Sequence, residues 1–206
     1  MSQFSTVLWD IGGVLLTNGW DHNERKVVFD KFELSAEDRQ EFEQRHEVEN
    51  DPWEKGTIDF DQYLKRTLFF KPRPFSPEAV RKAIEDQSML IPDTAMPVLR
   101  ELHEKGGVRM GQLNNESREL NDLRLARFGL RQYLSVFLCS GYVRLRKPDP
   151  AIYKMALEVL QKPASEVVFI DDREKNAAEA RALGLHAIQY TGSAALRAEL
   201  QTLGLL

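Results

Sequence analysis

The stretch VLWDIGGVLL, residues 7–16, decides the fold of this chain. An apolar run leads to a single carboxylate, Asp10, breaks at Gly12 and Gly13, and becomes apolar again. A run this apolar over residues 4–10 is typical of a strand in a parallel sheet that is covered on both faces. Taken alone, Asp10 and the two glycines indicate an ordinary turn, because Asp and Gly are common loop formers. A further role for Asp10 therefore depends on the rest of the chain.

Composition narrows the class of protein. The chain has 206 residues, 42% of them hydrophobic, a net charge of −4 and one cysteine, Cys139. This suits one domain with a small appendage, in a reducing compartment and without an internal disulfide. The N-terminus lacks the basic region of a signal peptide, and no apolar segment reaches membrane-spanning length. We expect a cytoplasmic protein that binds neither nucleic acid nor membrane; the sequence makes no prediction of oligomeric state.

The segment 17–89 is predicted to be helical. Ser35 is a good N-cap for one helix, and Asp59 with Gln62 forms a capping-box pattern for a second. Ser76 followed by Pro77 marks the start of a third. No convincing strand interrupts the segment, which we call the insert.

After Pro92 helices and strands alternate. The predicted strands are 108–113, 136–140, 167–171 and 186–190, and the predicted helices are 94–105, 117–128, 150–161, 174–183 and 193–203. Alternation of this kind favours a parallel sheet with right-handed crossovers. The chain is therefore predicted to be one α/β domain, residues 1–16 and 90–206, interrupted after its first strand by the helical insert.

Polar residues follow several of the predicted strands. Since ligands bind beyond the carboxyl ends of parallel strands, these residues are expected to meet at one edge of the sheet. Three carboxylates there would repel one another unless a cation neutralised them. Oxygen ligands with no cluster of His or Cys favour Mg²⁺ over zinc, and a nearby lysine suits a phosphate group. The residues concerned are Asp10, Asn114, Asn115, Lys147, Asp171 and Asp172.

In order and spacing these residues resemble the haloacid dehalogenase-like hydrolases, most of which are Mg²⁺-dependent phosphatases. The matching segments are WDIGGVL, GQLNNES, RKPDP and VVFIDDREKN, within about 1–16 and 90–190. The resemblance implies a doubly wound, Rossmann-like α/β core, with the insert as a helical cap that closes over the site. It also implies a phosphoric monoester hydrolase acting on a small phosphorylated metabolite.

The resemblance assigns roles to the residues of these motifs. Asp10 would be the nucleophile that forms an aspartyl-phosphate, which splits one hard step into two. Lys147 and Asn114 would contact the phosphoryl group. Mg²⁺ would be held by Asp10, Asp172 and the backbone carbonyl of Gly12, with support from Asp171 and Asn176. The backbone N–H groups of Gly12 and Gly13 would also meet the phosphate. Apart from the resemblance, Asn115 and Arg118, which follow the predicted strand 108–113, are further candidates for contact with the substrate.

The chain departs from the family pattern at Gly12. The family's phosphatases usually have an aspartate there that protonates the leaving group and then activates water, a contribution worth roughly 10²–10⁴ in rate. A leaving group of low pKa would need no proton, or Asp21 or His22 could substitute. A metal-independent haloacid dehalogenase and a weakly active or non-catalytic binding or regulatory protein stay as alternatives.

Overall fold

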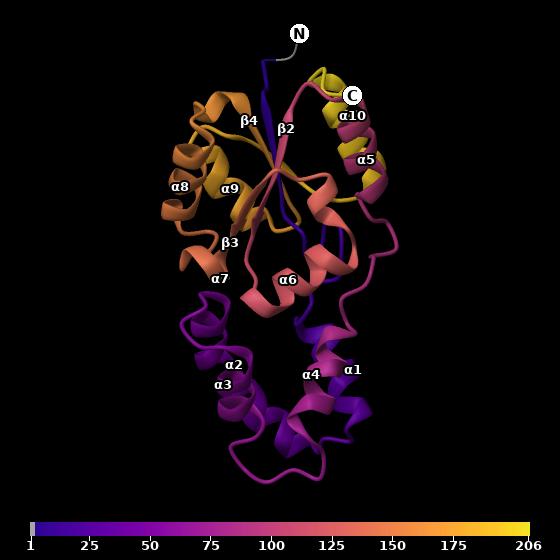
Figure 1. Ribbon diagram of the computed structural model, residues 1–206, viewed down its shortest axis with the longest axis vertical. Helices are drawn as coiled ribbons and strands as arrows, with labels where there is room; N and C mark the ends of the chain where they lie inside the picture. Colours follow the sequence, from indigo (N-terminus) through magenta and orange to yellow (C-terminus); the bar gives the residue numbers. More distant parts are fainter. Residues whose placement is uncertain (1–2) are drawn as a thin grey trace.

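The computed structural model describes residues 3–206, which form an α/β fold around one parallel sheet (Figure 1). The five strands are ordered β3-β2-β1-β4-β5, and every neighbouring pair is parallel. The strands are β1 Thr6–Trp9, β2 Arg109–Asn114, β3 Val136–Cys139, β4 Val167–Asp171 and β5 His186–Gln189. The predicted doubly wound parallel sheet is confirmed.

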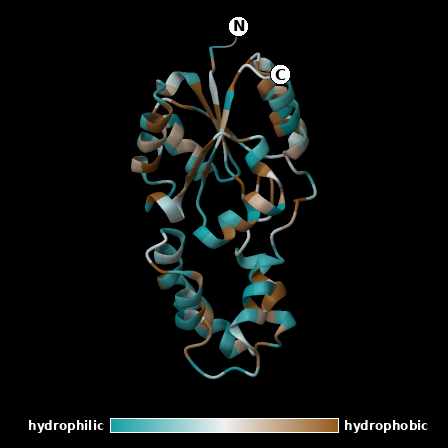
Figure 2. Ribbon diagram, viewed as in Figure 1, coloured by the Kyte–Doolittle hydropathy of each residue, from teal (hydrophilic) through white to brown (hydrophobic). Residues whose placement is uncertain are grey.

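Strand β1 lies at the centre of the sheet, and all four of its side chains are buried. Leu8 is in register with Gly111 on one side and with Phe169 on the other. Alternate residues point to opposite faces: Trp9 packs into one hydrophobic cluster and Leu8 into another. Figure 2 shows hydrophobic residues along these strands. The carboxyl end of β1, where Asp10 follows, is therefore held from both faces and both edges.

Helices cover both faces of the sheet (Figure 1). Helices α5 and α10 contribute to the cluster around Trp9, and α8 and α9 to the cluster around Leu8. The remaining two, α6 and the short α7, follow β2 and β3. Their bounds are α5 Met96–Lys105, α6 Arg118–Arg127, α7 Ser140–Val143, α8 Pro150–Leu160, α9 Glu174–Ala182 and α10 Ser193–Thr202. The predicted helices agree within about two residues, apart from α7, which was not predicted.

Four helices form the insert, and they have a hydrophobic cluster of their own around Phe42, Trp53 and Tyr63. They are α1 His22–Lys31, α2 Ala36–Glu54, α3 Phe60–Thr67 and α4 Pro77–Glu85. The expected N-caps Ser35, Asp59 and Ser76 are all present, and Asp59 forms the full capping box. Helix α1 was not predicted. Leu120 of α6 joins this cluster, so α6 packs against both the sheet layer and the insert.

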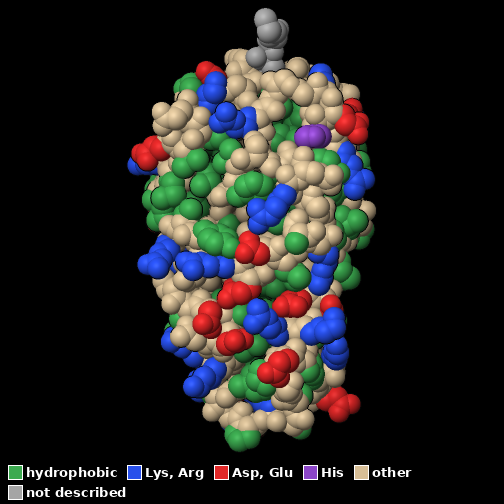
Figure 3. Space-filling view, in the orientation of Figure 1, with side chains coloured by type: hydrophobic (Ala, Val, Ile, Leu, Met, Phe, Trp, Pro, Cys, Tyr) green, Lys and Arg blue, Asp and Glu red, His purple; other side chains and the backbone are tan. Residues whose placement is uncertain are grey.

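The surface is highly charged. On the face in Figure 3, basic and acidic side chains are interspersed, and many of the acidic ones lie over the half that holds α1–α4. Among residues 3–206, no helix has both the length and the apolar character needed to span a bilayer.

Candidate active site

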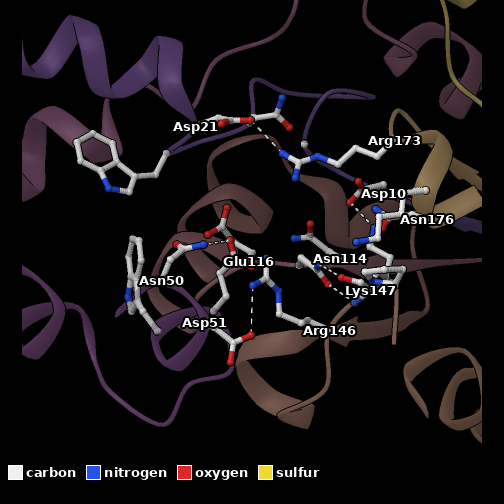
Figure 4. A pocket seen from close by; sticks show the side chains of 18 of the residues that line it. Asp10, Asp21, Asn50, Asp51, Asn114, Glu116, Arg146, Lys147, Arg173 and Asn176 are labelled. Atoms are coloured by element: carbon white, nitrogen blue, oxygen red, sulfur yellow. Dashed lines mark hydrogen bonds and ion pairs between the residues drawn. The ribbon is translucent and has the colours of Figure 1, made fainter. Parts of the chain in front are cut away.

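A cavity of about 490 Å³ lies between the carboxyl edge of the sheet and the insert. Asp10, Asn114 and Lys147 line it from the sheet side, and Asn50 and Asp51 of α2 lie across from them (Figure 4). Most of its lining is charged or polar. The carboxyl ends of β1 and β2 therefore open into a polar chamber that is closed on the far side by the insert.

Asp10 is buried at the floor of this cavity, 7% exposed. Its backbone N–H donates to Ile170 O at 2.8 Å, which extends the ladder with β4. Its Oδ1 accepts from the backbone N–H of Ile11 at 2.8 Å and lies 3.0 Å from Lys147 Nζ. No hydrogen bond among residues 3–206 uses Oδ2. One oxygen of Asp10 is thus fixed, and the other stays available to a ligand.

Lys147 lies between two carboxylates. Its Nζ donates to Asp171 Oδ2 at 2.6 Å in addition to its contact with Asp10, and the residue is 2% exposed. Asn115 holds the backbone of this lysine from both sides: Asn115 Nδ2 donates to Lys147 O, and Lys147 N donates to Asn115 Oδ1, both at 2.8 Å. The side chain of Asn115, predicted to contact substrate, is therefore committed to positioning Lys147.

Asp10, Asp171 and Asp172 have ligand atoms within 4.8 Å of one another, as a metal site requires. Both oxygens of Asp171 are occupied, by Lys147, by Asn176 Nδ2 and by the backbone N–H of Arg173. By contrast, Asp172 Oδ1 is buried without a hydrogen-bond partner. Such an orphaned oxygen beside a second carboxylate fits a hard divalent ion. Asp10 and Asp172 could hold the ion directly, and Asp171 could support it from behind.

The loop after β1 fits closely against this cluster. Gly13 has φ +69°, and a Cβ added there would lie 2.2 Å from Asp172 Oδ2, so only glycine is accommodated. Its N–H donates to Leu16 O, and Gly13 does not line the cavity. The expected contact of Gly13 with a phosphate has no support in this structure. Gly12 does line the cavity, and no hydrogen bond among residues 3–206 uses its carbonyl oxygen.

Burial decides the charge state of the cluster. It raises the pKa of Asp10 well above the usual range of a carboxyl; Lys147 opposes this rise, while Asp171 and Asp172 add to it. Burial also raises the pKa of Asp172, with a further contribution from Asp171. For Lys147, burial lowers the pKa, but the neighbouring carboxylates outweigh it and raise the pKa overall. A divalent cation at this position would favour the ionised form of Asp10.

The other predicted residues differ in their placement. Asn114 is 2% exposed, lines the cavity, and its Nδ2 is buried without a partner, as expected of a donor reserved for a ligand. Arg118 does not line the cavity: its Nε donates to Gly141 O at 2.6 Å, and its guanidinium lies over Tyr142. The structure therefore gives no support to a substrate contact by Arg118.

Two arginines of the sheet layer join it to the insert across the cavity. Arg146 Nη1 lies 3.2 Å from Asp51 Oδ1, and Arg146 Nη2 lies 2.7 Å from Glu54 Oε2. Arg173 pairs with Asp21 at 3.0 Å (Figure 4). Arg173 was missed by the sequence analysis, because nothing in a helix-initiating Asp-Asp-Arg-Glu run marks the arginine as facing a partner 152 residues away.

The two residues considered as substitutes for the missing acid are separated by the fold. Asp21 lines the cavity, but its Oδ1 accepts from His22 N at 2.8 Å and its Oδ2 pairs with Arg173. His22 does not line the cavity and is exposed. The geometry thus disfavours His22, and it leaves Asp21 as the N-cap of α1.

Comparison with known protein families matches residues 4–184 to the haloacid dehalogenase-like hydrolases. This range is most of the chain and includes all four motif segments together with the insert. The chain belongs to the haloacid dehalogenase-like hydrolase family.

Individual relatives carry phosphatase names. A ribulose-1,5-bisphosphate 5-phosphatase of Halopiger xanaduensis is 32% identical over 139 residues, which cover 64% of this chain and 57% of that protein. A sesquiterpene phosphatase of Aspergillus oryzae is 27% identical over 206 residues, 98% of this chain and 97% of that protein. The chain thus spans little more than half the length of the first relative and nearly all of the second.

Solved structures share the fold. A haloacid dehalogenase family enzyme of Bacteroides thetaiotaomicron, in complex with magnesium and inorganic phosphate, has a TM-score of 0.69 and 21% identity. The match covers 92% of this chain and 95% of that one. The arrangement of sheet and insert is therefore shared with an enzyme of the same family.

Proposed function

We propose that this protein is a Mg²⁺-dependent phosphatase that hydrolyses a phosphate monoester of a small metabolite through an aspartyl-phosphate on Asp10. The proposal rests mainly on two neighbouring carboxylate oxygens that are free to bind a metal ion. Asp10 Oδ2 has no hydrogen-bond partner among residues 3–206, and Asp172 Oδ1 is buried without one. The Bacteroides neighbour, which holds magnesium and phosphate, and the phosphatases among the relatives support it.

Each residue of the site has its own role in the proposed reaction. Asp10 Oδ2 forms a bond to phosphorus as the ester P–O bond breaks, and water later cleaves the aspartyl-phosphate to release inorganic phosphate and restore the carboxylate. Lys147 holds the other oxygen of Asp10 and opposes the negative charge that gathers there. Asn114 Nδ2 donates to a phosphoryl oxygen. Mg²⁺, held by Asp10, Asp172 and the Gly12 carbonyl, would supply Lewis-acid stabilisation of the phosphoryl charge.

Haloacid dehalogenation fits the site less well. Its substrate carries a carboxylate, which Asp171 and Asp172 would repel in the absence of a cation. The raised pKa of Asp10 points the same way, since a metal-free site would hold this nucleophile partly protonated at neutral pH.

A substrate panel tests the proposal. Phosphorylated metabolites and 4-nitrophenyl phosphate are assayed with Mg²⁺ and with EDTA, and acid-quenched samples are examined for phosphate bound covalently to the protein. We expect turnover that requires Mg²⁺ and is lost in Asp10→Asn, while Asp59→Asn, which keeps a good N-cap and does not line the cavity, matches the wild type. Equal inactivity of wild type and Asp10→Asn would refute the phosphatase and favour a binding or regulatory protein.

A further inference from the structure

The space beside Gly12 is filled by the carboxamide of Asn18. A Cβ atom added at Gly12 would lie 2.8 Å from Asn18 Oδ1 and 3.5 Å from Asn18 Cα. Both residues line the cavity. The chain turns back on itself between them, because Gly12 forms a bridge with Leu16 and Gly13 donates to Leu16 O. The carboxamide oxygen of Asn18 thus lies directly against the position at which the side chain of an aspartate at position 12 would begin.

The carboxylates that line the cavity beyond Asp10 are all committed elsewhere. Each accepts a hydrogen bond or forms an ion pair with a partner of its own. They are Asp21, Asp51, Glu54, Glu116 and Asp149. Burial raises the pKa of Glu116 to about 7, but both of its oxygens already accept hydrogen bonds, from Ser117 N and from Arg124 Nη1. The three atoms nearest to a Cβ at Gly12 all belong to Asn18 and none to these carboxylates.

The histidine of the cavity is committed as well. His46 Nε2 lies 3.2 Å from Arg25 Nη1, which can only donate, and Nδ1 lies 2.7 Å from Tyr63 Oη. Burial, followed by repulsion from Arg25, lowers the pKa of His46 to about 4. His46 is therefore neutral at physiological pH and carries no acidic proton toward the substrate.

We propose that Asn18 takes the place of the absent acid–base group: it donates a hydrogen bond from Nδ2 to the leaving oxygen of the substrate and transfers no proton to it. This inference rests on the proposed phosphatase activity. A carboxamide offers donors but no acidic proton. When Asp10 bonds to phosphorus and the ester bond breaks, the electron pair stays on the leaving oxygen, which departs as an anion and takes its proton from water.

A substrate class follows from this step. An oxygen that leaves as an anion must belong to an acidic group such as an enol, a phenol or a carboxylic acid, rather than to a simple alcohol. General acid catalysis is worth about 10²–10⁴ in rate, and an ester of a simple alcohol would forgo that contribution. The site is therefore suited to activated phosphates.

The rates of a series of substituted phenyl phosphates show whether the leaving oxygen is protonated, through the dependence of kcat/KM on the pKa of the leaving group. With Mg²⁺ present, we expect kcat/KM to fall by about 10²-fold or more from 4-nitrophenyl phosphate to the more basic leaving groups, because nothing protonates the departing oxygen. Asn18→Ala should lower all members of the series by a similar factor and keep the steep dependence, since it removes a hydrogen bond and no proton.

Asn18→Asp is the decisive variant, because it is isosteric and adds a carboxyl at the same place. We expect it to raise the rate on the least activated ester by at least about 10-fold, to flatten the dependence on leaving-group pKa, and to add a pH limb along which the rate falls as the new acid ionises. Asn50→Asp adds the same charge on the α2 side of the cavity, across from Asp10, and should keep the steep dependence (Figure 4).

The outcomes separate the two proposals. Turnover of 4-nitrophenyl phosphate with little dependence on the leaving group would overturn the role of Asn18 and leave the phosphatase intact. The same holds if Asn18→Asp retains the wild-type slope and pH profile while its Mg²⁺-induced thermal shift shows an intact site. No Mg²⁺-dependent turnover of any ester in the series would refute the phosphatase itself, and the inference with it.

Discussion

Replacement of Lys147 by methionine tests how the carboxylates of the site are held together. Lys147 Nζ lies 3.0 Å from Asp10 Oδ1 and 2.6 Å from Asp171 Oδ2, and the three side chains are 1%, 10% and 0% exposed. Methionine keeps the length of the side chain and removes its charge. The variant therefore leaves the buried carboxylates of Asp10 and Asp171, with the partly buried Asp172 beside them, without their cation.

The expected loss is set by the burial of these groups. Removal of one partner from a buried ion pair costs about 3–5 kcal/mol, because the remaining charge is desolvated and unpaired. Asp10 can take up a proton at little cost, because burial raises its pKa to about 8 and the loss of Lys147 raises it further. This keeps the loss from doubling although two pairs are broken. We expect Lys147→Met to lose about 3–5 kcal/mol of unfolding free energy at pH 7, or about 6–20 °C in Tm for a chain of this size.

Urea unfolding in EDTA and in Mg²⁺ provides the assay. In EDTA the loss should be full at pH 7 and smaller at pH 5, where protonation of Asp172, whose pKa burial raises, relieves part of the repulsion. Mg²⁺ should stabilise Lys147→Met more than the wild type, since a divalent cation supplies charge that the variant lacks. Lys175→Met, an exposed lysine of the same cavity, should change stability by no more than about 0.5 kcal/mol. A loss below about 1 kcal/mol for Lys147→Met in EDTA at pH 7, the value of an exposed pair, would refute the reasoning.

Three further predictions follow from the site and its surroundings. Asp172→Asn should abolish the Mg²⁺-induced rise in Tm, measured by thermal unfolding with and without EDTA; a retained rise would exclude Asp172 as a ligand. Gly13→Ala should lose at least about 1–3 kcal/mol in urea unfolding, since its φ is +69° and the new methyl meets Asp172, whereas Gly107→Ala, with φ +88° and no atom within 4 Å of an added Cβ, should lose only the conformational part. His46→Gln should remove a pH dependence of the unfolding free energy. The pKa of His46 is about 4 in the folded protein and about 6.5 in the unfolded chain, so between these pH values only the unfolded chain takes up the proton. Wild-type stability should therefore fall on acidification by up to about 3 kcal/mol, and the variant should lack this fall. If the difference between the variant and the wild type is constant over pH 4–7, His46 is not buried as described.

Much of the sheet could be predicted because its signals are local. The apolar run of β1 and the glycines that end the helices fix where strands and helices alternate, and the carboxyl-end rule then brings Asp10, Asn114, Lys147 and Asp172 to one edge. Helix α1 was missed because its sequence, HNERKVVFDK, has only a weak apolar face, and tertiary packing of Val28 and Phe29 stabilises it.

The details of the site depend on contacts that no local pattern encodes. Arg118 was predicted to reach the substrate, but its guanidinium turns toward Gly141 and Tyr142, at the unpredicted α7. Asn18 carries no motif at all, and its place beside Gly12 exists only because the chain folds back after Gly13. Motif spacing can thus predict the charged residues of such a site. A residue such as Asn18, which lies beside the position of an absent side chain, can be identified only in the structure.

The central position of β1 has a consequence for the folding of this protein during its synthesis on the ribosome. Thr6 pairs with Arg109 on one side and with Val167 on the other, so β1 is synthesised well before both of its neighbours and gains the second only when β4 follows. Domains generally fold as units during synthesis, and pairings this distant in sequence are slow to form. Until β4 emerges, an apolar strand has an open edge, while the helices of the insert, with their own hydrophobic cluster, can already gather. A nascent chain arrested before residue 167 would therefore have an unpaired edge on β1 that can associate with other chains, and it would lack Asp171 and Asp172. Chaperones would bind the chain in this form.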